Sequence, residues 1–119
     1  DLRSHLELDD YLSAVKKQMQ DGYKMVCFQV EGEIVALAGY RISQNLAWGK
    51  HLYIDDLVSL EARRSLGYGK RILAEVIEIA KQEGCQQLHL DSGVQRFEAH
   101  RFYLREGFKI SSHHFSMDL

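Results

Sequence analysis

The stretch RRSLGYGK, which begins at Arg63, combines two glycines with several basic side chains. Gly67 and Gly69 allow the backbone to come close to a ligand, because they carry no Cβ atom. A helical pattern follows, and the first N–H groups of a helix have no internal partners and attract negative charge. Arg64 and Lys70 add positive charge. The stretch therefore predicts a loop that binds an anion such as a phosphate, although a plain glycine turn before a surface helix has the same local pattern.

Two common phosphate-binding motifs can be excluded for this loop. A P-loop needs Ser or Thr after Gly-Lys, but Arg71 stands there, and Arg64 stands where the first glycine should be. The dinucleotide fingerprint needs a third glycine at the position of Ile72. What remains is the pattern Arg-x-x-Gly-x-Gly between a predicted strand and a predicted helix.

Histidines are the other side chains that suit proton transfer near neutral pH. His51, His89 and His100 are candidate general bases, because the ordinary pKa of histidine is about 6.5. Each of them also fits a structural or exposed position. The pair His113-His114 suggests a metal site, but no further ligand has suitable spacing, so we expect no metal.

Hydrophobic periodicity predicts alternating helices and strands that would position these residues. The strand–helix–strand order in the second half implies at least one parallel strand pair with a crossover, in an α/β (α+β) fold. The predicted elements are a helix over residues 8–20, a hairpin over 24–42 with its turn at Glu31-Gly32, a loop over 43–50, a strand over 51–60, a helix over 69–81, a strand over 85–91, a helix over 94–106 and a strand over 108–119.

Composition narrows the class of protein. The 119 residues, 45% hydrophobic and 27% charged, predict a single globular domain over residues 1–119. A net charge of -2 argues against a nucleic-acid partner. The sequence has no apolar run of about 18 residues, so it predicts no membrane span. Cys27 and Cys85 lie in apolar stretches, which favours two buried thiols in a reducing compartment and hence a cytoplasmic protein.

Two motifs together resemble the GCN5-related N-acetyltransferase (GNAT) superfamily. Arg64, Gly67 and Gly69 match its Arg/Gln-x-x-Gly-x-Gly/Ala signature, and EAHRFYLREGF, about 35 residues downstream, matches its Ala-x-x-Phe-Tyr-x-x-x-Gly-Phe pattern. The resemblance covers roughly residues 24–119. It implies a mixed, mostly antiparallel sheet flanked by helices, with a parallel strand pair at the cofactor site. The family's first strand would precede residue 1, so we expect a chain without its N-terminal strand.

The resemblance also implies an activity and a set of site residues. Acetyl-CoA would serve as co-substrate, and the acetyl group would pass directly to a primary amine of a small molecule or peptide. Tyr103 would protonate the departing thiolate. The glycine loop would hold the pyrophosphate through backbone N–H groups, and the preceding strand would pair with the pantetheine arm. The cofactor-binding residues implied in this way are Leu57, Val58, Ser59, Arg63, Arg64, Ser65, Leu66, Gly67, Tyr68, Gly69 and Lys70.

Asp55 and Asp56 are candidate catalytic residues on the acceptor side. Strand alternation predicts that one of them points inward and the other outward. An inward carboxylate beside the thioester would take a proton from the amine or bind a cationic acceptor. The other interpretation of both residues is solvation of a strand end.

Three further positions bear on this interpretation. Ser65 replaces a glycine that is common in the family's loop, and Arg96 replaces an asparagine that contacts the cofactor in many members. Trp48 would line a pocket or cover the edge of the core. The alternative function is a non-catalytic acyl-CoA-binding or regulatory module. The resemblance is compatible with a homodimer, because dimers are common in the family, but the sequence itself does not set the oligomeric state.

Overall fold

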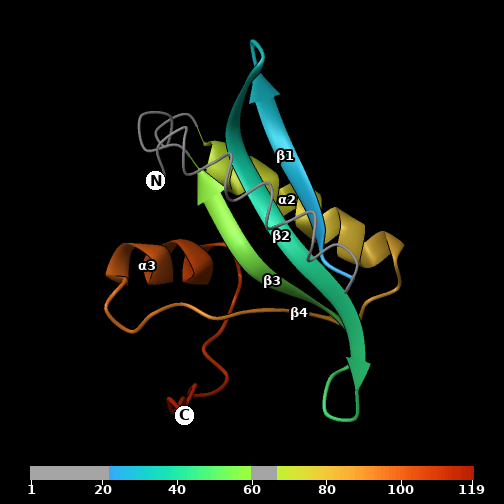
Figure 1. Cartoon of the computed structure of the whole chain (residues 1–119), viewed down its shortest axis with the longest axis vertical. Helices are drawn as coiled ribbons and strands as arrows, with labels where there is room; N and C mark the ends of the chain where they lie inside the picture. Colours follow the sequence, from blue (N-terminus) through green and yellow to red (C-terminus); the bar gives the residue numbers. More distant parts are fainter. Residues whose placement is uncertain (1–21, 60–66) are drawn as a thin grey trace.

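The computed structural model describes residues 22–59 and 67–119. The helix predicted over residues 8–20 lies outside them, and so do four predicted cofactor-binding residues, Arg63, Arg64, Ser65 and Leu66. The described elements are the strands β1 (Lys24–Val30), β2 (Glu33–Asn45), β3 (Gly49–Ser59) and β4 (Gln87–Leu90), and the helices α2 (Tyr68–Gln82) and α3 (Phe97–Arg105) (Figure 1).

The four strands form one sheet in the order β1-β2-β3-β4. β2 lies antiparallel to both of its neighbours, β1 and β3, whereas β4 lies parallel to β3. The parallel pair joins His51 to Gln87 and Ile54 to Leu90. Since parallel strands need a long crossover, the intervening α2 makes this topology possible. The predicted mixed, mostly antiparallel sheet with one parallel pair is therefore confirmed.

The hairpin between β1 and β2 turns where the sequence predicted it. Glu31 and Gly32 both have positive φ, 52° and 80°. A two-residue type I′ turn requires positive φ at both central positions, because that backbone twist matches the twist of the flanking strands.

The loop predicted over residues 43–50 is wrong. β2 continues to Asn45 and β3 begins at Gly49, which leaves only a short turn between them. The polar residues there predicted a loop, but their backbones pair in the ladder and their side chains reach solvent at the end of the sheet. The backbone N–H of Trp48 donates to Asn45 Oδ1 at 2.7 Å, which supports the turn.

The hydrophobic core lies between α2 and one face of the sheet (Figure 1). Helical spacing brings Ile72, Leu73 and Val76 to the same side of α2, and each is at most 1% exposed. Leu52 and Ile54 of β3 meet them from the sheet. The crossover helix is thus the element that holds β3 in place.

α3 is attached more loosely than α2. None of its residues is buried, although Phe102 packs against the core. Gly107, with φ of 102°, follows directly after its end, as the sequence predicted.

The strand predicted over residues 108–119 is wrong, because this segment has no regular secondary structure and lies exposed except for Phe108. A strand needs a partner edge, and β4 offers only four residues. The polar stretch SSHH also gives the segment no continuous apolar face.

Burial also corrects the expectation for the thiols. Cys27 is exposed and Cys85 is half-buried, and both are free. Val26 and Phe28 turn toward the core, so the intervening Cys27 faces away from it. In the part of the chain that the structure describes, no helix is long and apolar enough to cross a membrane.

Candidate active site

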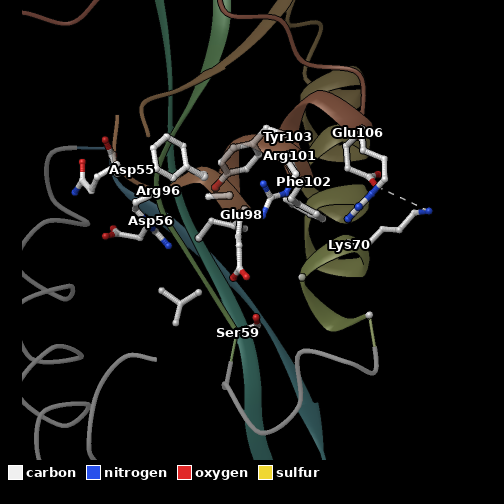
Figure 2. Close-up of a pocket in the computed structure, with 18 residues that line it drawn as sticks. Asp55, Asp56, Ser59, Lys70, Arg96, Glu98, Arg101, Phe102, Tyr103 and Glu106 are labelled. Carbon is white, nitrogen blue, oxygen red and sulfur yellow. Dashed lines mark ion pairs between the residues drawn. The ribbon is translucent and has the colours of Figure 1, made fainter. Parts of the chain in front are cut away.

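A cavity of about 1230 Å³ opens beside the second half of β3 (Figure 2). β4 pairs with β3 only up to Ile54, so the edge of β3 beyond that point has no neighbouring strand among the described residues. The start of α2 and one side of α3 form the other walls. The predicted site residues that meet here are Asp55, Asp56, Leu57, Val58, Ser59, Gly67, Gly69, Lys70 and Tyr103.

Tyr68 differs from its neighbours in the glycine loop. Its side chain is 9% exposed and belongs to the core, where its ring meets Phe28 edge-on at a centroid distance of 5.8 Å. The ring is therefore committed to packing, and only the backbone of Tyr68 can serve a ligand in the cavity.

The start of α2 has the geometry of an anion site. Gly67 caps the helix in the left-handed region, with φ of 78°, and no side chain caps it. Its first N–H groups therefore keep their capacity to bind a ligand. A Cβ added to Gly67 would meet no atom within 4 Å, so the approach is open. Lys70 Nζ lies 3.9 Å from Glu106 Oε2 and links the start of α2 to α3.

Tyr103 lines the cavity from α3, together with the charged residues Glu98, Arg101 and Arg105 (Figure 2). The rings of Phe102 and Phe108 lie 5.4 and 5.7 Å away between centroids and hold it in place. Burial raises the pKa of Tyr103 above its ordinary value, while the positive charge of Arg96 lowers it in part. The hydroxyl therefore carries its proton at neutral pH and can donate it.

A β-bulge changes how the two aspartates are presented. Gly39 pairs with Asp56 and Tyr40 pairs with Ile54, so Asp55 is an extra residue without a partner in the ladder. The extra residue interrupts the strict alternation of side chains. Both carboxylates consequently line the cavity, and the prediction of one inward and one outward carboxylate is wrong.

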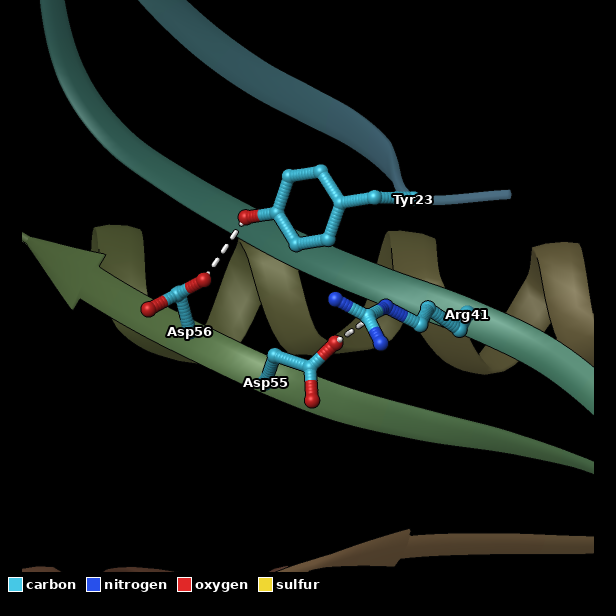
Figure 3. A network of polar contacts seen from close by, with 4 residues as sticks. All are labelled: Tyr23, Arg41, Asp55 and Asp56. Atoms are coloured by element: carbon cyan, nitrogen blue, oxygen red, sulfur yellow. Dashed lines mark hydrogen bonds and ion pairs between the residues drawn. The ribbon is translucent and has the colours of Figure 1, made fainter. Parts of the chain in front are cut away.

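The two carboxylates have different partners (Figure 3). Arg41 Nε of β2 lies 3.3 Å from Asp55 Oδ2, and the Tyr23 hydroxyl donates to Asp56 Oδ2 at 2.7 Å. Burial raises the pKa of Asp55, Arg41 opposes this, and the neighbouring Asp56 adds to it. Asp55 therefore belongs to an ion pair, whereas Asp56 accepts a hydrogen bond from an uncharged hydroxyl.

Tyr23 is a site residue that sequence reasoning missed. Its side chain is 1% exposed and lies across Gly39, where an added Cβ would overlap the Tyr23 hydroxyl. Glycine inside a strand often marks the close approach of another group, so Gly39 was the available signal. The missing Cβ is what lets Tyr23 reach Asp56.

The candidate histidine bases lie away from the cavity. His89 stacks on Trp48 with 3.5 Å between ring centroids, and His51 meets the same ring edge-on. Burial, together with the charge of His51, lowers the pKa of His89. His100 Nε2 lies 2.7 Å from the Gly93 carbonyl oxygen. None of these side chains lines the cavity, and Trp48 covers the edge of the sheet rather than the site.

His113 and His114 form no metal site with the rest of the described chain. His114 Nδ1 lies 3.6 Å from Asp91 Oδ2. Residues 22–59 and 67–119 contain no group of three or more His, Cys, Asp or Glu side chains placed to hold a metal ion.

Comparison with known proteins agrees with this geometry. The profile of the acetyltransferase (GNAT) family matches residues 2–108. The chain is 36% identical over 117 residues to the "uncharacterized N-acetyltransferase YhdJ" of Bacillus subtilis, across 97% of this chain and 82% of that protein. It is 35% identical over 89 residues to the aminoalkylphosphonate N-acetyltransferase of Salmonella typhimurium, across 74% of this chain and 58% of that protein.

A solved structure supports the fold independently. AAC(6')-Iy, determined in complex with the bisubstrate analog CoA-S-monomethyl-acetylneamine, gives a TM-score of 0.80 at 16% identity, across 93% of this chain and 79% of that one. At this identity the likeness concerns the fold alone. Because the family profile and a relative that aligns over nearly the whole chain agree with the sheet and cavity described above, the chain belongs to the acetyltransferase (GNAT) family and is an N-acetyltransferase.

Proposed function

We propose that the protein transfers an acetyl group from acetyl-CoA directly to the primary amine of a small molecule. One observation carries this proposal: a single cavity holds an open strand edge at residues 57–59, the uncapped start of α2 and a protonated Tyr103. Neither Cys27 nor Cys85 lines this cavity, so a covalent cysteine intermediate has no support.

The residues present fit the cofactor. The backbone N–H groups that follow Gly67 would hold the pyrophosphate, with Lys70 nearby as a positive charge. The free edge at residues 57–59 would bind the amide groups of the pantetheine arm as an added strand does. A Cβ added to Gly69 would lie 3.8 Å from Ser59 Oγ, so glycine keeps the space between strand edge and helix open. The bound cofactor supplies the acetyl group as a thioester.

Two side chains would move the protons, and a third would bind the amine. Tyr103 would give its hydroxyl proton to the departing thiolate, because burial keeps that proton in place at neutral pH. Asp56 would bind the incoming ammonium, and Asp55, whose pKa is raised, would be a better base than an exposed aspartate. All three line the same cavity.

The small-molecule acceptor is also supported by the relatives. The Salmonella protein is named for its action on aminoalkylphosphonates, and the analog bound to AAC(6')-Iy carries an acetylneamine group. Both are small amines, and a cavity of about 1230 Å³ has room for such an acceptor beside the cofactor.

The direct test is release of free thiol from acetyl-CoA in the presence of a panel of small amines. We expect amine-dependent release, together with a rise in Tm when acetyl-CoA is added. At a concentration of about 100 times the Kd, the cofactor should add about 2.7 kcal/mol to the free energy of unfolding.

Two variants make the test specific. Gly69→Trp should abolish the rise in Tm because its side chain fills the space beside Ser59, whereas Gly69→Ala should keep most of it. No stabilisation of the unmodified protein by millimolar acetyl-CoA would overturn the proposal. Stabilisation without thiol release from any amine would favour the non-catalytic acyl-CoA-binding module.

A further inference from the structure

Asp55 and Asp56 line the part of the cavity that we call the acceptor end. This end is less negatively charged than two aspartates would make it, because one of them has a cationic partner. Arg41 Nε lies 3.3 Å from Asp55 Oδ2, so this carboxylate is already neutralised by a partner from β2. Asp56 is different, because its partner Tyr23 is uncharged. Of these two aspartates, Asp56 is therefore the one without a cationic partner among the described residues, and it is the better placed to bind an ammonium group.

A further charge lines the same cavity. Arg96, immediately before α3, is one of the lining residues, together with Asp55 and Asp56 (Figure 2). Its guanidinium makes no ion pair with the described residues, in contrast to Arg41 and Lys70. Its charge also acts on Tyr103, which places it near the reacting atoms. An unpaired guanidinium at such a position is suited to bind a carboxylate or phosphate through paired hydrogen bonds.

We propose that the acceptor is a small amine that also carries an anionic group, either a carboxylate or a phosphate, and that Arg96 binds this group while Asp56 binds the ammonium. The proposal rests on the proposed acetyl transfer and specifies its acceptor. In such a zwitterion the ammonium would pair with Asp56 and the anionic group with Arg96, whereas a second ammonium would meet Arg96 and be repelled.

Tyr23 fixes the orientation of the Asp56 carboxylate in this arrangement. Its hydroxyl engages Asp56 Oδ2, while Oδ1 accepts no hydrogen bond from the described residues. Because Tyr23 is 1% exposed and packed across Gly39, it holds the carboxylate in one orientation. We therefore assign Tyr23 as a positioning residue for the ammonium, with Oδ1 as the acceptor.

The experiment compares amines that share a short two-carbon spacer. Propylamine carries no second charge, β-alanine a carboxylate, phosphoethanolamine a phosphate and ethylenediamine a second ammonium. We expect kcat/KM for the better of the two zwitterions to exceed that for propylamine by about tenfold or more, since a charge-assisted hydrogen bond contributes that much. Ethylenediamine should be the poorest substrate. The comparison of kcat/KM for β-alanine and phosphoethanolamine shows which anionic group is preferred.

Substitution of Arg96 tests the assignment. Arg96→Gln should bring the ratio between zwitterion and propylamine close to one, while Arg96→Lys should restore part of it. Lys81→Gln removes the same charge from the last turn of α2, away from the cavity, and should leave the ratio unchanged.

Three results would overturn the proposal. The first is a preference of the unmodified protein for propylamine or ethylenediamine. The second is an Arg96→Gln variant whose ratio is unchanged. The third is an Arg96→Gln variant in which the KM of acetyl-CoA rises while the ratio stays the same, which would assign Arg96 to the cofactor.

Binding decides the question separately from turnover. If no amine is acetylated, calorimetric titration of β-alanine and phosphoethanolamine into the CoA-saturated protein still applies. Binding that Arg96→Gln abolishes would support the zwitterion site while the proposed transfer fails. No binding of either compound, or binding that Arg96→Gln leaves unchanged, would reject the site.

Discussion

The two halves of β3 differ in how many neighbours they have. From His51 to Ile54 the strand pairs with β2 on one side and β4 on the other, and Leu52 and Ile54 are buried against α2. Over residues 56–59 it pairs with β2 alone among the described residues, and the edge that this leaves open faces the cavity. The bulge at Asp55 marks the boundary. One strand therefore provides support in its first half and a ligand-accessible edge in its second.

This difference explains where chemistry can occur on the strand. Paired backbone groups in the first half have no capacity for a ligand, while an open edge presents N–H and C=O groups that an extended molecule can pair with. The bulge adds two side chains to that edge. Substitutions of ligand-facing groups in the open half should therefore lower activity. Substitutions in the paired half should lower the free energy of unfolding.

The largest expected effect is on turnover. Tyr103→Phe should lower kcat by about a hundredfold or more, because it removes the proton donor. Tyr53→Phe is the matched control, since the Tyr53 hydroxyl donates to Asp91 in the paired half and lines no part of the cavity. Steady-state kinetics with calorimetric measurement of acetyl-CoA binding would check both variants. An equal loss of kcat in the two variants would contradict the assignment of Tyr103 as the proton donor.

The next effect is on stability in the paired half. Leu52→Ala should lower the free energy of unfolding by about 2–5 kcal/mol, because the side chain is fully buried and would leave a cavity. Val58→Ala in the open half should cost clearly less, since Val58 is only half-buried. Denaturant unfolding measures both changes, and a larger loss for Val58→Ala would contradict the comparison.

A substitution at Gly39 should affect both the stability of the protein and its activity. Gly39→Ala should cost about 1–3 kcal/mol, because the new Cβ takes the place of the Tyr23 hydroxyl. It should also lower kcat/KM for the amine by releasing Asp56. The double variant Tyr23→Ala/Gly39→Ala should lose less stability than the two single variants lose together, because removal of the Tyr23 ring relieves the clash with the new Cβ. Full additivity would show that Tyr23 and Gly39 do not interact.

The smallest expected effect is a shift in the pH profile. Tyr103 must be protonated to act as an acid, so kcat should fall as the pH rises past its pKa. Burial raises that pKa, which moves the alkaline limb above the ordinary value of 10.0 for tyrosine, and Arg96 lowers it in part. Arg96→Gln should therefore move the limb further upward, and Tyr103→Phe should remove it. A limb that moves downward in Arg96→Gln would reject this assignment.

The prediction of elements succeeded where a local pattern carried the information. The 3.6-residue period predicted α2 to within one residue at each end, and Glu31-Gly32 predicted the first hairpin turn. The loop over 43–50 failed because polar residues at the end of a sheet still pair through their backbones. The strand over 108–119 failed because pairing depends on an available edge, which no local pattern shows.

The site was predictable in part for the same reason. Local spacing indicated the glycine loop as one of two interpretations, and the family resemblance implied the role of Tyr103, because both belong to motifs that are continuous in the sequence. Tyr23 belongs to no motif, and its contact with Asp56 spans 33 positions. Asp55 and Asp56 were identified by residue type, but the bulge that exposes both to the cavity depends on the register between β2 and β3.

By itself, the sequence determined the order of the elements from β1 to α3, the position of the first hairpin turn and the residue types available for chemistry. These follow from periodicity, from glycine's access to positive φ and from side-chain chemistry, all of which act over a few residues. Only the tertiary structure decided that the described residues leave an edge of β3 open, that two neighbouring aspartates line one cavity and that Arg41 and Tyr23 contact them. These features depend on which strands pair and in which register, and pairing energies between distant segments have no signature in local spacing.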